Sequence, residues 1–119
     1  MKYTEFLQAA DPNGIDQHAP GAKLDAGKVR PSLILGPMAR ALLAVAEVGT
    51  YGANKYTDGG WQSVPDAQKR YTDARDRHQL YEAIEPNDVE SGLKHAAHAA
   101  WNALARLELM LREEQGTAQ

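Results

Sequence analysis

The feature that most constrains the fold is a long apolar stripe in the C-terminal third of the chain. After the break made by Pro86, leucine and alanine recur at helical spacing over about five turns, at Leu93, Ala97, Ala100, Leu104, Leu107 and Leu111. Side chains three and four residues apart lie on one face of an α-helix. The stripe therefore predicts an amphipathic helix, and the polar tail Glu113–Gln119 beyond it is predicted to fray.

Two earlier segments also have helical spacing. Pro37 stands at a plausible first helical position, and apolar residues continue from there towards Tyr56. A second helix is predicted from about Ala67 to Ala83. No stretch alternates with period two for long enough to form a sheet. The predicted fold class is all-α, a bundle of three to four helices completed by self-association into a dimer or tetramer, because three helices alone bury little core.

The first 36 residues differ from the rest in composition. Glycine, proline and aspartate are frequent, and turn sequences such as Pro20-Gly21 interrupt a segment without apolar periodicity. We therefore predict an irregular N-terminal arm over residues 1–36, which contributes to the substrate site, and a helical domain over residues 37–119.

Composition excludes several classes of protein. The chain has 119 residues, no cysteine and a formal charge of −3, which excludes a disulfide scaffold, a thiolate metal site and a thiol nucleophile. The acidic balance argues against stable nucleic-acid binding. No apolar run approaches the roughly 20 residues of a membrane span, and no signal or transit peptide is recognisable. A cytoplasmic location is expected.

The predicted C-terminal helix carries two histidines away from its apolar stripe. On a helical wheel, His95, His98 and Asn102 lie within about 60° of one another and roughly opposite the stripe. This face is either solvated or a ligand-bearing surface. On both readings His98 lies outside the predicted core, so its replacement is expected to leave the fold intact.

Four carboxylates lie close together immediately before this helix, at Glu82, Glu85, Asp88 and Glu90. Such a group repels itself unless it is well solvated or a cation lies among its members. His78 lies one helical turn before Glu82 and is predicted to point inward. Mixed imidazole and carboxylate ligands without thiolate suit Mn²⁺, Mg²⁺ or Co²⁺, ions that serve phosphoryl chemistry. A metal site and a solvated acidic loop both remain open.

Basic residues occupy a different part of the sequence. Lys23, Lys28 and Arg30 flank Gly27 in the arm, where they form either a phosphate-binding segment or a solvated one. The spacing of the glycines and the valine after Lys28 exclude a P-loop.

A second cationic segment lies near the end of the first predicted helix. Lys55 is placed between Tyr51 and Tyr56, with Trp61 nearby. This arrangement suits stacking of a nucleobase beside a phosphate contact. Core packing would explain the aromatic residues almost as well, but it does not explain the lysine.

Four blocks of the sequence carry a family resemblance: K-x-D-x-G-K-x-R from residue 23, Y-G-A-x-K-Y from residue 51 with Trp61, R-Y-x-D-A-x-x-R-H from residue 70, and D-x-E-S-G-L-x-H-x-x-H-A-A-x-N from residue 88. In this order they resemble the bacteriophage dATP/dGTP diphosphohydrolases, the MazG-like enzymes called MazZ. The resemblance covers about residues 23–111. It implies a MazG-like helical enzyme that converts dATP or dGTP to the monophosphate and pyrophosphate with a divalent metal. In some phages this reaction supplies dGMP for 2-aminoadenine DNA.

The resulting hypothesis assigns a role to each candidate residue. Metal ligands are His78, Glu82, Glu85, Asp88, His95 and His98. Catalytic residues among them are Glu82, Glu85, Asp88 and His98. Substrate-binding residues are Lys23, Lys28, Arg30, Lys55, Tyr56, Trp61 and Arg77. MazG proteins typically carry E-x-x-E on one helix and E-x-x-D on the next. Here Glu82-x-x-Glu85 matches the first motif, His95-x-x-His98 stands at the second, and Glu47 is a further candidate ligand.

Two other functions stay open on the sequence alone. The chain could be a non-catalytic helical binding module whose histidine and acidic faces bind a partner. It could also be a phosphohydrolase that uses histidine and aspartate ligands and releases triphosphate. The reaction products distinguish these functions from pyrophosphate release.

Overall fold

The structure of the protein is a computed structural model that describes residues 9–117. The remaining parts of the predicted arm and tail, residues 1–8 and 118–119, lie outside the described residues. The chain divides into two compact units, Met1–Pro37 and Met38–Gln119. The described elements are η2 (Pro31–Leu33), α1 (Ala39–Lys55), η3 (Gly60–Ser63), α2 (Ala67–Glu82) and α3 (His95–Thr117). Residues 9–117 contain no β-strand, so the all-α prediction is confirmed.

In the first unit, the buried carboxylate of Asp11 organises the chain. It accepts the backbone N–H groups of Asn13, Ile15 and Lys23 at 2.7, 3.3 and 2.8 Å. These bonds, led by the one from Lys23, lower the pKa of the Asp11 carboxyl although burial raises it. The segment predicted to be irregular is therefore folded into turns that one side chain holds together.

Proline residues lie just before the starts of α1 and α2 and shortly after the end of α2. Helix α1 begins at Ala39, soon after Pro37, and α2 begins at Ala67, soon after Pro65. Helix α2 ends before Pro86, as the sequence predicts. Helix α3 continues to Thr117, so the predicted fraying of the tail from Glu113 is wrong over the described residues.

Contacts between elements explain the longer α3. The Gln68 side chain of α2 donates to the Glu113 carboxylate at 2.6 Å, and Arg112 donates to the Gln62 side chain of η3 at 2.7 Å. Both bonds connect the last turns of α3 to elements far earlier in the sequence. The composition of the tail alone gives no sign of these contacts.

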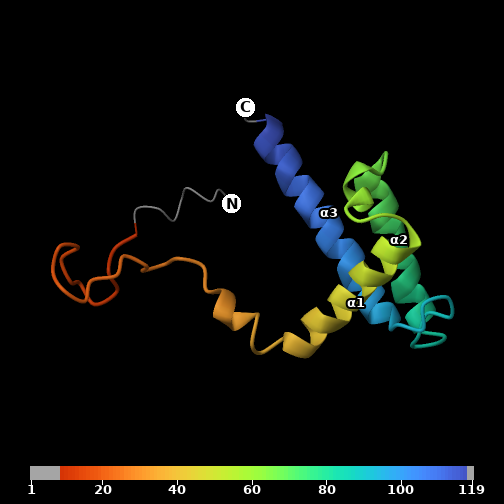
Figure 1. Ribbon diagram of the computed structural model, residues 1–119, viewed down its shortest axis with the longest axis horizontal. Helices are drawn as coiled ribbons and strands as arrows, with labels where there is room; N and C mark the ends of the chain where they lie inside the picture. Colours follow the sequence, from red (N-terminus) through yellow and green to blue (C-terminus); the bar gives the residue numbers. More distant parts are fainter. Residues whose placement is uncertain (1–8, 118–119) are drawn as a thin grey trace. The chain divides into compact units, whose positions relative to one another are not determined.

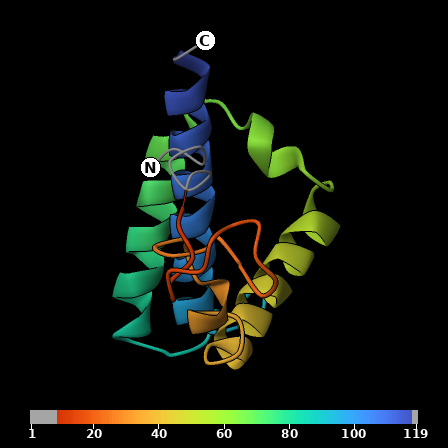
Figure 2. The same cartoon turned by 90° about the vertical axis from the view of Figure 1, so that its left-hand side faces the viewer.

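Helix α3 packs against both α1 and α2 (Figures 1 and 2). It runs antiparallel to α2, because Gln68 at the start of α2 contacts Glu113 near the end of α3, whereas His78 contacts His95. Buried small side chains let the helices approach closely, at Ala97, Ala99 and Ala105 of α3.

Aromatic packing fixes η3 against α2 and α3. The Trp101 ring makes edge-to-face contacts with Trp61 and Tyr71, with centroids 6.0 and 5.7 Å apart. The Tyr71 hydroxyl donates to the Trp61 carbonyl at 2.6 Å. Each edge-to-face pair contributes about 0.5–1.5 kcal/mol beyond the burial of its area. On the α1 side, a Cβ at Gly49 would lie 3.2 Å from the Trp101 indole nitrogen, so glycine permits the close approach of α1.

Helix α3 buries mainly the face that carries His95, His98 and Asn102, and of the predicted apolar stripe only Ala97 is buried. Leu104 and Leu107 of the apolar stripe are 50% and 46% exposed, whereas His95 and His98 are only 4% and 7% exposed. Asn102 is buried with them. The expectation that His98 lies outside the core is therefore wrong. A helical wheel shows which residues share a face but not which face meets the neighbouring helices.

Among the described residues, no helix is both long enough and apolar enough to cross a membrane.

Candidate metal centre and substrate cleft

Three imidazole rings meet where α2 packs against the first turn of α3. His78 of α2 stacks on His98 of α3, with centroids 4.5 Å apart and planes inclined by 10°. The Nδ1 atoms of His78 and His95 lie 2.9 Å apart. The two faces that the sequence singled out on different helices therefore form one cluster, in which His95 and His98 are buried.

The loop between α2 and α3 brings Asp88 to the same cluster. An isolated bridge between Asn87 and Lys94 closes the loop, and Gly92 adopts a left-handed φ of 74° that permits its tight turn. The Asp88 carboxylate accepts the backbone N–H and the hydroxyl of Ser91, each at 2.8 Å. Its Oδ2 lies 3.8 Å from His98 Nε2. The loop thus holds Asp88 against the imidazole rings.

The residues His78, Asp88 and His95 have the arrangement of a possible metal site. Each offers one ligand atom, and these atoms lie within 4.8 Å of one another. Two imidazole nitrogens bound at right angles to one ion, at the usual distance of about 2.1 Å, would lie about 3 Å apart. The 2.9 Å separation of the His78 and His95 Nδ1 atoms fits this geometry. A borderline divalent ion such as Mn²⁺ or Co²⁺ suits these nitrogen and oxygen donors.

The electrostatics of the cluster favour a neutral imidazole pair beside an ionised carboxylate. Burial lowers the pKa of His78 and of His98, and the neighbouring imidazoles lower both further; Asp88 opposes the shift at each. Burial raises the pKa of Asp88, but the Ser91 N–H and hydroxyl outweigh it and leave that pKa below its ordinary value. Unprotonated imidazole and ionised carboxylate are the forms that bind metal.

A cleft of about 1080 Å³ lies in front of this cluster. Seven of the predicted site residues line it: Lys55, Tyr56, Trp61, Arg77, His78, Asp88 and His98. They come from α1, η3, α2, α3 and the connecting segments. The structure therefore brings cationic, aromatic and metal-ligating side chains from the three sequence blocks that begin at residues 51, 70 and 88 to one cavity.

Lys55 lies in this cleft as one half of an ion pair. Its ammonium is 2.7 Å from the Glu90 carboxylate and 5.3 Å from the centre of the Tyr56 ring. The bond raises the pKa of Lys55 and lowers that of Glu90. Because both side chains are partly exposed, a polyphosphate can compete with Glu90 for the lysine.

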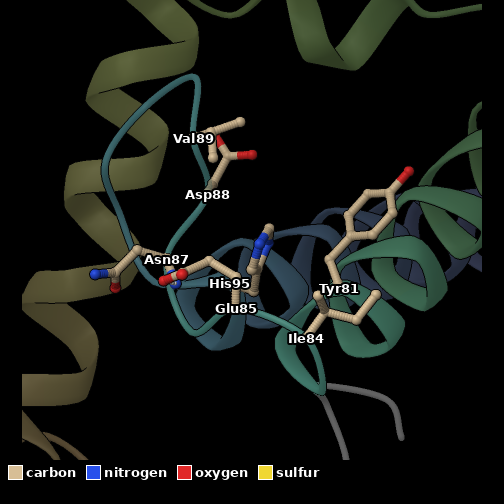
Figure 3. Close-up of a pocket in the computed structure, with 7 residues that line it drawn as sticks. All are labelled: Tyr81, Ile84, Glu85, Asn87, Asp88, Val89 and His95. Carbon is tan, nitrogen blue, oxygen red and sulfur yellow. Dashed lines mark hydrogen bonds between the residues drawn. The ribbon is translucent and has the colours of Figure 1, made fainter.

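Residues of the same loop also line a smaller pocket of about 370 Å³ (Figure 3). Asp88 and His95 contribute its polar atoms, together with Glu85 and Asn87, and Tyr81, Ile84 and Val89 contribute apolar walls. Asp88 therefore lines both cavities, while His78 lines the cleft and His95 lines the smaller pocket.

Several predicted residues lie outside the cluster. Glu82, the last residue of α2, is exposed and lines neither cavity. Glu85 lines the smaller pocket, where its carboxylate accepts the Asn87 N–H at 3.2 Å. Glu47 is exposed and also lines neither cavity. Lys23, Lys28 and Arg30 belong to the first unit. The roles of these residues stay predictions.

The structure adds cleft and loop residues that the hypothesis from the sequence did not assign as ligands, catalytic residues or substrate-binding residues. Tyr51, Arg70, Glu90 and Asn102 line the cleft, and Ser91 contacts both Asp88 and His98. The Asn102 amide donates to the His98 carbonyl at 2.9 Å. Their signal in the sequence was their position inside the blocks that begin at residues 51, 70 and 88.

The fold and the site define a class: an all-α protein in which an imidazole–carboxylate cluster lies in the wall of a cleft lined by cations. Comparison with known proteins identifies the family. The family model described as dATP/dGTP diphosphohydrolase, N-terminal, matches residues 18–119. The chain belongs to this family, which confirms the resemblance seen in its four sequence blocks.

A protein of Salmonella phage PMBT28 named dATP/dGTP diphosphohydrolase is 43% identical over 81 residues. The match covers 67% of this chain and 26% of that protein, so the chain spans about a quarter of the length of this relative. No solved structure matches the chain.

Stability should fall as the pH is lowered below the ordinary histidine pKa. Burial lowers the pKa of His78 and His98 below 6.5, so the unfolded chain binds more protons than the folded chain just below this value. The free energy of unfolding therefore decreases as the pH falls. We expect the melting temperature of chelator-treated protein to decrease from about pH 7.5 to about pH 5.5.

Two variants test whether the pH dependence of the melting temperature comes from the imidazole cluster or from a histidine elsewhere. His18→Gln changes an exposed residue of the first unit and should leave the pH dependence as it is. His78→Gln should reduce it. A melting temperature that is constant or rises as the pH falls over this range would show that the imidazoles are not held neutral.

Proposed function

We propose that the chain is a metal-dependent hydrolase that converts dATP or dGTP to the monophosphate and pyrophosphate. The observation that carries the proposal is the convergence of the His78, Asp88 and His95 ligand atoms within 4.8 Å, with Asp88 also lining a cleft that holds Lys55 and Arg77. The family description and the printed name of the phage relative support this reaction.

In this proposal, the α2–α3 interface positions the metal ligands. His78, Asp88 and His95 hold a divalent cation, which when bound supplies Lewis-acid polarisation of a phosphate and activation of a water molecule. His98 stacks on the His78 ring and limits its rotation. The burial of His95 and His98 excludes bulk water from the inner side of the cluster.

The cationic residues of the cleft bind the phosphate oxygens. Lys55 and Arg77 line the cleft with Arg70, and binding of a triphosphate releases Lys55 from Glu90. Charged donors to phosphate form the stronger class of hydrogen bond. Tyr56, whose side chain is 73% exposed, offers an aromatic face for the base, and Trp61 lines the same cleft.

We propose the same phosphate-binding role for Lys23, Lys28 and Arg30 of the first unit. The family model includes these residues, because its match begins at residue 18. Loss of one such charged contact costs about 1.5–3 kcal/mol, or roughly ten- to a hundred-fold in affinity.

We place this reaction in the cytoplasm of a phage-infected host, where the deoxynucleotide pool is found, and propose that its dGMP product supplies 2-aminoadenine DNA synthesis. The phage origin of the named relative supports this setting. Nucleoside analysis of the DNA of the phage that encodes the chain tests the second part, which fails if that DNA contains adenine and no 2-aminoadenine.

Product analysis tests the proposed reaction directly. Incubation with each of the eight common nucleoside triphosphates and Mn²⁺, Mg²⁺ or Co²⁺, followed by chromatography, should give monophosphate and pyrophosphate from dATP or dGTP. Release of triphosphate would instead show the alternative phosphohydrolase chemistry. If no nucleotide is hydrolysed with any of the three metals, the non-catalytic binding module is the remaining function.

Matched variants relate turnover to the site. Asp88→Asn should lower kcat by more than about a hundred-fold, because it removes a charged ligand. Asp73→Asn alters an exposed α2 aspartate that pairs with Lys69 and should retain wild-type turnover. Lys28→Ala should raise KM about ten- to a hundred-fold without lowering the melting temperature of the free protein.

We also propose that the chain self-associates through the exposed stripe of α3. Leu104 and Leu107 are about half exposed although they belong to the most regular apolar pattern in the sequence. Light scattering at micromolar concentration should give a mass of at least twice 13.0 kDa. The double variant Leu104→Gln and Leu107→Gln should lower this mass. A wild-type species of 13.0 kDa would contradict self-association.

A further inference from the structure

The Ser91 hydroxyl is the point at which the Asp88 carboxylate and the His98 ring are connected. Its oxygen lies 2.8 Å from Asp88 Oδ2 and 2.7 Å from His98 Nε2. We propose that Ser91 is a positioning residue, which orients the Asp88 carboxylate and holds His98 in the tautomer protonated at Nε2. The catalytic consequence rests on the proposed function, whereas the tautomer itself does not.

The single hydroxyl proton decides the direction of these hydrogen bonds. The Leu93 N–H donates to Ser91 Oγ at 3.1 Å, so the oxygen accepts on that side. The hydroxyl donates to the Asp88 carboxylate, which is ionised and can only accept. No hydroxyl proton remains for His98, so the ring must donate its Nε2–H to Ser91 Oγ. In the neutral ring, the lone pair available to the site is then on Nδ1.

The backbone of the loop fixes Ser91 where it can make these contacts. The Ser91 N–H donates to the same Asp88 oxygen at 2.8 Å, and the Gly92 N–H donates to the Asp88 carbonyl at 2.7 Å. The Asp88 N–H in turn donates to the Leu93 carbonyl at 2.7 Å. The hydroxyl is therefore held by a closed turn rather than by a freely rotating segment.

The consequence for the site is that two functional groups are oriented by one side chain. Asp88 Oδ2 is occupied by Ser91, which leaves Oδ1 to face a cation. Stacking on His78 fixes the plane of the His98 ring, and the bond to Ser91 fixes which edge of the ring faces the loop.

The same contacts exclude a different role for Ser91. A nucleophilic serine transfers its proton to an unprotonated histidine nitrogen in hydrogen-bond contact with its oxygen. Here the hydroxyl proton points to Asp88, and His98 Nε2 carries a proton of its own. The tautomer of His98 therefore distinguishes a positioning serine from a nucleophilic one.

Long-range ¹H–¹⁵N NMR of the imidazole rings tests the proposal in metal-free wild-type protein. At about pH 8, where imidazole is neutral, the His98 ring, assigned through its Cβ, should be protonated at Nε2. Protonation at Nδ1 in the wild-type protein would overturn the proposal, whether or not any variant folds.

Two substitutions supply the matched comparison. Ser91→Ala removes the hydroxyl and should give a mixture of His98 tautomers, whereas Ser91→Thr keeps a hydroxyl and should preserve the wild-type tautomer. An unchanged tautomer in folded Ser91→Ala would also overturn the proposal.

Kinetics then test the catalytic consequence. Ser91→Ala should lower kcat about 10- to 100-fold with little change in KM, because Ser91 lies behind the proposed ligand, and Ser91→Thr should restore most of kcat. Unchanged kcat in Ser91→Ala would refute the catalytic role. If the wild-type protein hydrolyses no nucleotide, the proposed function fails, while the NMR result still decides the tautomer.

Discussion

The second unit of this structure depends on the burial of imidazole rings between two helices. In the described residues, the helix interface at the start of α3 is built from His95, His98 and small alanines rather than from large apolar side chains. Buried polar groups destabilise a fold unless they find hydrogen-bond partners. Here the partners are the His78 ring and the Ser91 hydroxyl. The hydrogen bonds that offset the cost of burying these imidazole rings also assemble the candidate site.

This constraint explains why the α2–α3 loop matters as much as the helices. His98 can be buried because Ser91 satisfies its Nε2, and Ser91 is in place because the loop folds back on Asp88. The loop also carries Glu90, which holds Lys55 of α1 at 2.7 Å. One short segment thus connects the ligand cluster with the cationic side of the cleft, which suits a substrate whose phosphates reach both.

Much of the architecture could be predicted from the sequence, because prolines and apolar spacing are local signals. The starts of α1 and α2 and the end of α2 lie near Pro37, Pro65 and Pro86. The face that α3 buries could not be predicted, since it depends on which surface of the other helices it meets. The face of α3 that carries Leu104 has the stronger apolar pattern in the sequence, but the face that carries His98 is the buried one. Similarly, the length of α3 depends on the distant contact between Gln68 and Glu113.

The sequence indicated candidate residues of the site better than it indicated which of them lie together in space. Imidazoles and carboxylates near Pro86 indicated a metal site, and the structure places His78, Asp88 and His95 together. Sequence proximity and the match of Glu82-x-x-Glu85 to the E-x-x-E motif also suggested Glu82 and Glu85, whose ligand roles stay predictions. The chain reverses direction after α2, and this turn directs Asp88 towards the histidines while Glu82 remains exposed.

The central claim is that His78, Asp88 and His95 form one divalent metal site. The most direct test is anomalous diffraction at the manganese edge from crystals of the protein grown with Mn²⁺. The account predicts an anomalous peak within bonding distance, about 2.0–2.3 Å, of the two Nδ1 atoms and one Asp88 oxygen. Ordered manganese bound elsewhere, with the three side chains of the cluster in contact with one another and no peak between them, would contradict it.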